Sequence, residues 1–170
     1  MDLARRSLFS GRLRTPQPLL RPPWSPAEGT FTSMCTRCGD CLKACPTGVL
    51  QAGPGGTPVA DFSHSHCTFC GDCSRVCTPH AIAAERTMPA WDLAIHIGAG
   101  CLTEQNVVCR SCGEICESAA IRFAPRLGGV AKPEVLADRC TACGECVGAC
   151  PSQAIRVARQ EQPVISEIAA

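Results

Sequence analysis

Apolar and polar residues alternate most regularly just past the middle of the chain. Trp91, Leu93, Ile95 and Ile97 are separated from one another by single residues that are polar or small. A period of two is typical of a β-strand with one buried face, because successive side chains of a strand point to opposite sides. A strand is therefore predicted over residues 91–97.

A second pattern is a short apolar pair that occurs four times, always four and five residues after a cysteine. Successive pairs lie roughly thirty to forty residues apart, which indicates an internal repeat. Each repeat is expected to hold a ligand loop, a short helix and a short strand. The pairs are Val49-Leu50, Ala81-Ile82, Ala120-Ile121 and Ala154-Ile155.

The cysteines that precede these pairs form four groups of four, which together use all sixteen. Three groups have the spacing Cys-x2-Cys-x2-Cys-x3-Cys. Three thiolates at that spacing can wrap a cubic 4Fe-4S cluster in one loop, and in two-cluster ferredoxins the fourth ligates the neighbouring cluster. The regular groups are Cys35, Cys38, Cys41 and Cys45; Cys67, Cys70, Cys73 and Cys77; and Cys140, Cys143, Cys146 and Cys150.

The remaining group, Cys101, Cys109, Cys112 and Cys116, has a first gap of seven residues rather than two, and Glu117 replaces the proline found after Cys45 and Cys150. The inserted residues could form a surface loop around a normal cluster. The alternative is that these thiols are merely buried or bind a degraded cluster. We expect 4Fe-4S clusters at the three regular groups and a fourth at this one.

If the units follow two-cluster ferredoxins, the fourth cysteines are exchanged between the paired groups. Cys77 then completes the ligands Cys35, Cys38 and Cys41, while Cys45 completes Cys67, Cys70 and Cys73. In the other pair, Cys150 joins Cys101, Cys109 and Cys112, while Cys116 joins Cys140, Cys143 and Cys146.

Turn signals show how the repeats pair. Glycine-rich segments separate the first repeat from the second and the third from the fourth, whereas none separates the second from the third. The prediction is an α+β protein with two two-cluster ferredoxin-like units in tandem, in which small strands and short helices wrap the clusters. The expected divisions are a basic, proline-rich arm at 1–30, units at 31–88 and 89–158, and a polar tail at 159–170.

Composition agrees with metal-supported folding. Aromatic residues are only 4% of the chain and tyrosine is absent. A conventional core would be thin, so folding and cluster binding should be coupled. The formal net charge is +1, which gives no reason to expect nucleic-acid binding.

Disulfides would require an oxidising compartment. Arg5 and Arg6 resemble a twin-arginine signal, but no apolar segment follows them, and no stretch is apolar enough to span a bilayer. We therefore expect a cytoplasmic protein with reduced thiols.

Zinc ribbons also use Cys-x2-Cys pairs, but a third cysteine at the same spacing has no role in one such site. His64 and His66 flank Cys67, and histidines replace cysteines in Rieske centres. Because the cysteine set is already complete, a solvated turn or a hydrogen bond near the ligands is the expected role of these histidines.

No catalytic constellation is found, and no cysteine remains to act as a nucleophile, so an enzyme is not expected. The arm is either a disordered leader or a docking segment for an acidic partner surface. In the docking interpretation, Arg5 and Arg6 steer the partner and Trp24 anchors it.

Beyond the cysteines, the chain resembles the NapF family of ferredoxin-type proteins. The resemblance rests on the Arg5-Arg6 start, the Arg21-Pro22-Pro23-Trp24-Ser25 and Ala90-Trp91-Asp92-Leu93 segments, and the stretched third group. One departure is Thr78, which stands where a proline usually follows the fourth cysteine.

The resemblance implies a cytoplasmic accessory factor that assists maturation of NapA before its export. NapA is the molybdenum-containing catalytic subunit of periplasmic nitrate reductase, and it carries an iron–sulfur cluster itself. The implied partner is the NapA precursor, and redox proteins could serve as electron donors. The alternative is a general electron-transfer polyferredoxin.

Overall fold

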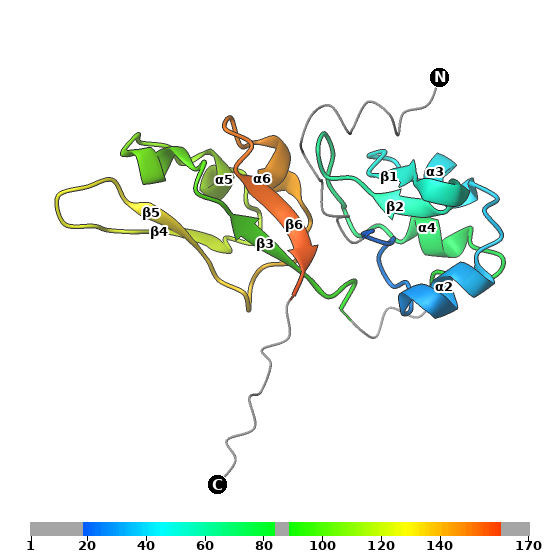
Figure 1. Ribbon diagram of the computed structural model, residues 1–170. Coiled ribbons are helices and arrows are strands. Elements are labelled where there is room, and N and C mark those ends of the chain that lie inside the picture. The colour runs from blue at the N-terminus through cyan, green and yellow to red at the C-terminus, as the bar shows by residue number, and fades with distance from the viewer. Residues whose placement is uncertain (1–18, 84–88, 161–170) are drawn as a thin grey trace, which may run out of the picture.

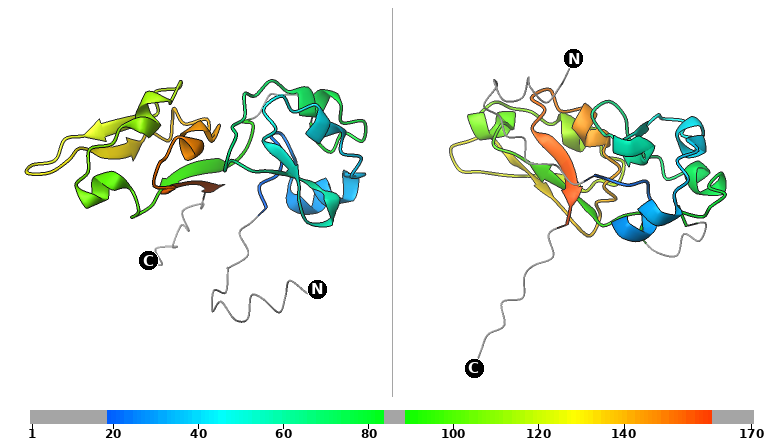
Figure 2. Two further views of the ribbon diagram at one scale, coloured as in Figure 1. Left: turned by 90° about the horizontal axis from the view of Figure 1, so that it is seen from above. Right: turned by 45° about the vertical axis from the view of Figure 1, so that its right-hand side comes forward.

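A computed structural model describes residues 19–83 and 89–160 of the chain. It has two lobes that lie side by side, each built from short helices and small strands (Figure 1; Figure 2, left). Within the described ranges the strands form three separate two-stranded sheets, all antiparallel. No helix there has the length and apolar character needed to cross a membrane.

The first unit is organised around one hairpin and two helical turns. Strand β1 (Leu50–Ala52) pairs with β2 (Pro58–Ala60) across the short 3-10 helix η1 (Pro54–Gly56), as the glycine-rich linker predicts. Helices α3 (Asp40–Lys43) and α4 (Asp72–Arg75) pack against each other.

The second unit repeats this plan and adds a second strand pair. Strand β3 (Leu93–Ile97) pairs with β6 (Ile155–Arg159), so the first and last strands of the unit close it together. Between them lie η2 (Leu102–Gln105), α5 (Ser111–Glu114), the hairpin of β4 (Ile121–Ala124) and β5 (Lys132–Val135), and α6 (Glu145–Gly148).

Three of the four predicted tail strands are present, and the alternating segment that begins at Trp91 does form a strand. Ala81-Ile82 is the exception, because it forms a bend rather than a strand. Both residues are only 1% exposed, so the pair contributes to the core without a strand partner. At the other end of the second unit, β6 extends through Arg159, one residue past the expected limit of 158.

Backbone conformation confirms the fourfold repeat. The third residue after each fourth cysteine adopts the left-handed conformation, with φ of 68°, 53°, 48° and 52° at Gly48, His80, Ala119 and Gln153. Only one of these is glycine, so three residues accept a backbone that side chains disfavour. The repeated loop geometry therefore outweighs local preference.

Residues 19–30 differ from the expected free arm, because they pack against the first unit. The Arg21 side chain is 6% exposed and donates to Thr57 Oγ1 at 2.9 Å and to the carbonyl of Pro58 at 3.0 Å. It also donates twice to the Glu28 carboxylate and lies 5.1 Å from the centre of the Phe31 ring. Helix α2 (Glu28–Met34) therefore crosses the expected boundary at residue 30.

Trp24 has an intramolecular role as well. Its backbone N–H donates to the carbonyl of Ala90 at 2.5 Å, and its backbone carbonyl accepts from the N–H of Ala83 at 3.0 Å. The indole packs, half-buried, against the core of the first unit. These contacts hold Trp24 against the first unit, and its role as an anchor for a partner stays a prediction. Arg5 and Arg6 lie outside the described residues.

Replacing Arg21 by alanine should destabilise the loaded protein by about 2 kcal/mol, because its buried acceptors, Thr57 Oγ1 and the Pro58 carbonyl, lose their donor. The matched control is Arg75→Ala, since Arg75 is an exposed arginine paired with Asp72 in α4. That substitution should change stability by less than about 0.5 kcal/mol. Anaerobic denaturant unfolding measures both. An equal decrease in the free energy of unfolding in the two variants would show that the buried hydrogen bonds of Arg21 add no more stability than an exposed ion pair.

Candidate metal centre

The described thiols gather at four places, which we name sites I to IV after the group that supplies the first three cysteines. In every group the third cysteine is buried, and the second is more exposed than the third. These third cysteines, each 7–9% exposed, are Cys41, Cys73, Cys112 and Cys146.

Three small cavities show the exchanged pattern directly. Each is walled by three cysteines of one group and by the fourth cysteine of its paired group. Site I holds Cys35, Cys38, Cys41 and Cys77. Site II holds Cys45, Cys67, Cys70 and Cys73. Site IV holds Cys116, Cys140, Cys143 and Cys146.

Site III is assembled in the same way despite its stretched spacing. Burial, and then the neighbouring Cys101, Cys109 and Cys150, raise the pKa of the Cys112 thiol to about 11. The seven residues between Cys101 and Cys109 make a folded turn that includes η2, with Thr103 buried at 1% and Val108 exposed at 75%. The insertion is therefore a surface loop that returns Cys109 to its place beside Cys101.

The electrostatics of the other sites follow the same principle. Burial, and then the neighbouring thiols, raise the pKa of Cys41 to about 11 and that of Cys73 and Cys146 to about 12. Four thiolates cannot share such an environment without a compensating positive charge, and ligation requires thiolates. The sites therefore suit a cationic iron core.

The lining of three cavities suits a cluster. Four sulfurs wall each cavity at sites I, II and IV. A 4Fe-4S cluster takes four cysteine thiolates as its ligands.

Sequence reasoning missed a set of hydrogen-bond donors to the sulfurs. The hydroxyl two residues after a fourth cysteine lies 3.6 Å from Sγ at Cys45, 3.4 Å at Cys116 and 3.5 Å at Cys150. The amides of Ala120 and Ala154 also donate to Cys116 and Cys150, each at 3.3 Å. The sequence pattern that could have predicted these donors is Cys-x-Ser/Thr. It is absent at Cys77, where Pro79 occupies the third position.

These donors act on the thiolate form. Burial alone would raise the pKa of Cys150, but the Ser152 hydroxyl and the backbone amides that follow lower it below its usual value. Thr47 and nearby amides oppose burial in the same way at Cys45. Hydrogen bonds to ligand sulfurs are one means by which a protein sets cluster potential.

The two histidines beside Cys67 do not line the cavities of sites I, II and IV. His64 is exposed and lines the groove between the two units. The backbone carbonyl of His66 accepts a hydrogen bond from Thr47 Oγ1 at 2.7 Å. Thr47 in turn contacts Cys45, so this residue pair supports the ligand loop of site II through the backbone.

Paired sulfur sites in two successive units define a ferredoxin of the dicluster type. The family model for the 4Fe-4S dicluster domain matches residues 34–81 and 107–154, one match in each unit. The second match begins after Cys101, which the structure places near Cys112.

The chain belongs to the NapF family of ferredoxin-type proteins. It is 41% identical to ferredoxin-type protein NapF of Escherichia coli over 155 residues, which cover 91% of this chain and 94% of the relative. NapF of Haemophilus influenzae is 42% identical over 164 residues, covering 91% and 93%. The methylamine utilization ferredoxin-type protein MauM of Methylorubrum extorquens is 31% identical over 161 residues, covering 84% and 73%.

Proposed function

We propose that this protein is a cytoplasmic accessory factor in the maturation of the nitrate reductase catalytic subunit NapA before export. The observation that carries the proposal is similarity to NapF proteins over 91% of the chain. In this role the protein binds the NapA precursor and acts on its iron–sulfur cluster by delivery, reduction or protection. It does so as a binding and electron-transfer protein, not as an enzyme.

Four 4Fe-4S clusters, held by the sixteen cysteines in sites I to IV, are part of this proposal. The clusters supply one-electron chemistry, while the chain shields them with buried third cysteines and tunes them with donors to the sulfurs. The cytoplasmic location is likewise part of the proposal, because a reducing compartment keeps thiols available as ligands.

The second candidate function is a general electron carrier. It is favoured by the exposure of Cys38 and Cys70, which brings an edge of sites I and II to the surface. A carrier needs only small, transient contacts with several redox proteins. The two functions therefore differ in whether one dedicated partner is bound.

The basic segment before residue 19 should separate these functions. Deleting residues 1–18 should leave the clusters intact but weaken capture of NapA precursor from cytoplasm, because exposed arginines contribute steering and modest, salt-sensitive affinity. The deletion stops at 18 because Arg21 and Trp24 belong to the first unit.

A double substitution tests the position of the charge. Arg5→Ala with Arg6→Ala should weaken capture more than Arg12→Ala with Arg14→Ala, which removes the same charge from the same segment. If the truncated protein captures the precursor as tightly as the full chain across a salt series, the segment is a passive leader. If the full chain captures no precursor, the carrier function is favoured instead.

A further inference from the structure

The two units meet at the ligand loops of sites II and IV. The N–H of Cys67 donates to the carbonyl of Cys143 at 2.9 Å. Cys67 belongs to site II and Cys143 to site IV, so ligand residues of different units are joined by one hydrogen bond.

Aromatic packing holds this junction together. Trp91 lies edge-on to Phe62 and Phe69 of the first unit, with ring centres 5.5 and 5.7 Å apart. Its Nε1–H donates to the carbonyl of Thr141 at 3.2 Å, in the ligand loop of site IV. Trp91 therefore contacts both sides of the junction.

Phe62 also fits against a glycine of the opposing ligand loop. A Cβ added to Gly144 would lie 2.0 Å from Phe62 Cδ1, and Gly144 has φ of +86°. The corresponding residue of site I, Gly39, has φ of +79° but open space around it. Both glycines therefore have the positive φ that side chains disfavour, but of the two only Gly144 is in close contact with Phe62.

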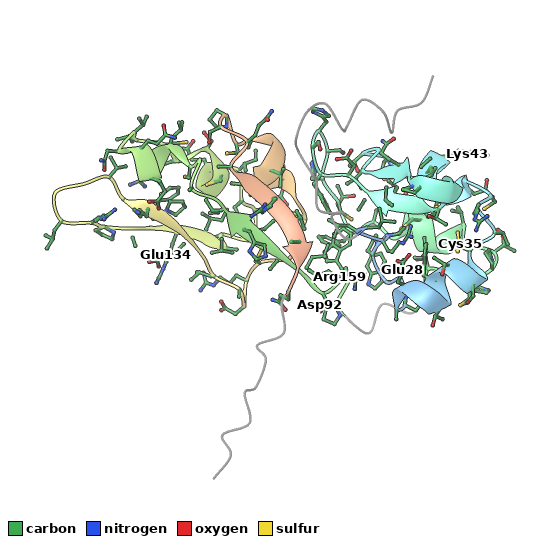
Figure 3. All side chains as sticks on the ribbon, in the orientation of Figure 1. Glu28, Cys35, Lys43, Asp92, Glu134 and Arg159 are labelled. Carbon is green, nitrogen blue, oxygen red and sulfur yellow. The ribbon has the colours of Figure 1, made fainter. Side chains whose placement is uncertain are left out.

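Arg159, at the end of β6, lies within electrostatic range of the first unit. The hydrogen bond from Arg21 lowers the pKa of the Glu28 carboxyl, and the charge of Arg159 contributes in the same direction. Figure 3 shows Glu28 and Arg159 at the boundary between the two lobes.

We propose that the two units form one electron path, in which electrons pass between them through Cys67 and Cys143. Within each unit the sites also adjoin, since Cys73 lies within electrostatic range of Cys41, and Cys146 of Cys112. The resulting order is site I, site II, site IV, site III, which differs from the order along the chain. This inference holds whether the partner is NapA or another redox protein.

Each transfer in this path moves one electron. The clusters, when bound by the cysteines of sites II and IV, would supply one-electron chemistry that forms no bond and needs no proton. The loops that hold Cys67 and Cys143 would be the part of the chain between them. The electron enters from a low-potential, one-electron protein donor and leaves to an oxidised partner. The rival interpretation is two independent carriers whose contact is only structural.

The test compares full-length wild-type protein with Gly144→Ala, Trp91→Ala and the control Gly39→Ala. All four are purified anaerobically, checked for equal iron content and fully photoreduced. Hydrogen-exchange mass spectrometry follows the peptide that contains Cys67, and electron paramagnetic resonance measures magnetic interaction among the reduced clusters. Trp91→Ala lies outside the ligand loops, so it keeps the test valid if Gly144→Ala loses iron from site IV.

We expect Gly144→Ala and Trp91→Ala to lose protection at Cys67 together with part of the interaction broadening, because pairs within each unit persist. Gly39→Ala places a similar backbone strain in the ligand loop of site I without the contact to Phe62, so with its iron content equal to wild type it should retain both. The proposal is overturned if the broadening is the same in all four proteins, or if protection at Cys67 is lost while the broadening is unchanged.

Discussion

Removing the iron should cost the protein most of its secondary structure. The buried core of each unit includes ligand cysteines, with Cys41, Cys67 and Cys73 in the first and Cys112 and Cys146 in the second. The second core has only three other buried members, Ile95, Ile121 and Ile155. Such a core is too small to offset the entropy of ordering the chain, so metal binding and folding are coupled.

Far-ultraviolet circular dichroism before and after anaerobic chelation measures the effect, and reconstitution with iron and sulfide is the control. The helical and strand signal should be lost on chelation and should return on reconstitution. A metal-free protein with native-like signal and a sharp thermal transition would show that the apolar residues suffice to fold the chain.

Replacing Cys77 by alanine should damage site I and leave site II loaded, although Cys77 belongs to the second cysteine group. Cys45→Ala should have the converse effect. The physical reason is that each fourth cysteine crosses to the paired cavity, where it stands beside the other group's buried third cysteine.

Double variants identify the site by non-additivity. Cys38→Ala combined with Cys77→Ala should lose no more iron than either single variant, because both substitutions act on site I. Cys70→Ala combined with Cys77→Ala should lose the iron of two sites. The reverse result, with Cys77 additive to Cys38 and not to Cys70, would mean that each group binds its own cluster.

The cysteine grouping and the two-unit plan could be predicted because both depend on local spacing. Three thiols in one loop and an apolar pair at a fixed distance need no knowledge of the tertiary fold. The strand that begins near Trp91 was predictable for the same reason, since a period of two is a local signal.

Features that depend on a distant partner could not be predicted. Ala81-Ile82 has the same sequence signal as the other tails, yet within residues 19–83 and 89–160 no strand pairs with it. Arg21 looks like an exposed arm residue until Thr57 and Pro58 are placed beside it. The backbone hydrogen bond from Cys67 to Cys143 joins the two units, and no local sequence pattern predicts that contact.

The family resemblance supplied what spacing could not. Nothing in Cys-x2-Cys runs distinguishes an electron carrier from a maturation factor, because cluster potentials span a wide range set by their surroundings. The stretched third group is the informative case. Its spacing left a degraded cluster open, and only the position of Cys101 beside Cys112 and Cys150 indicates a complete ligand set.

The most direct test of the central claim is the metal content of anaerobically purified protein. Iron and acid-labile sulfide analysis, combined with native mass spectrometry, should give about sixteen irons and a matching number of sulfides per chain, the content of four cubic clusters. About twelve of each would remove site III from the account. Zinc in place of iron would contradict it altogether.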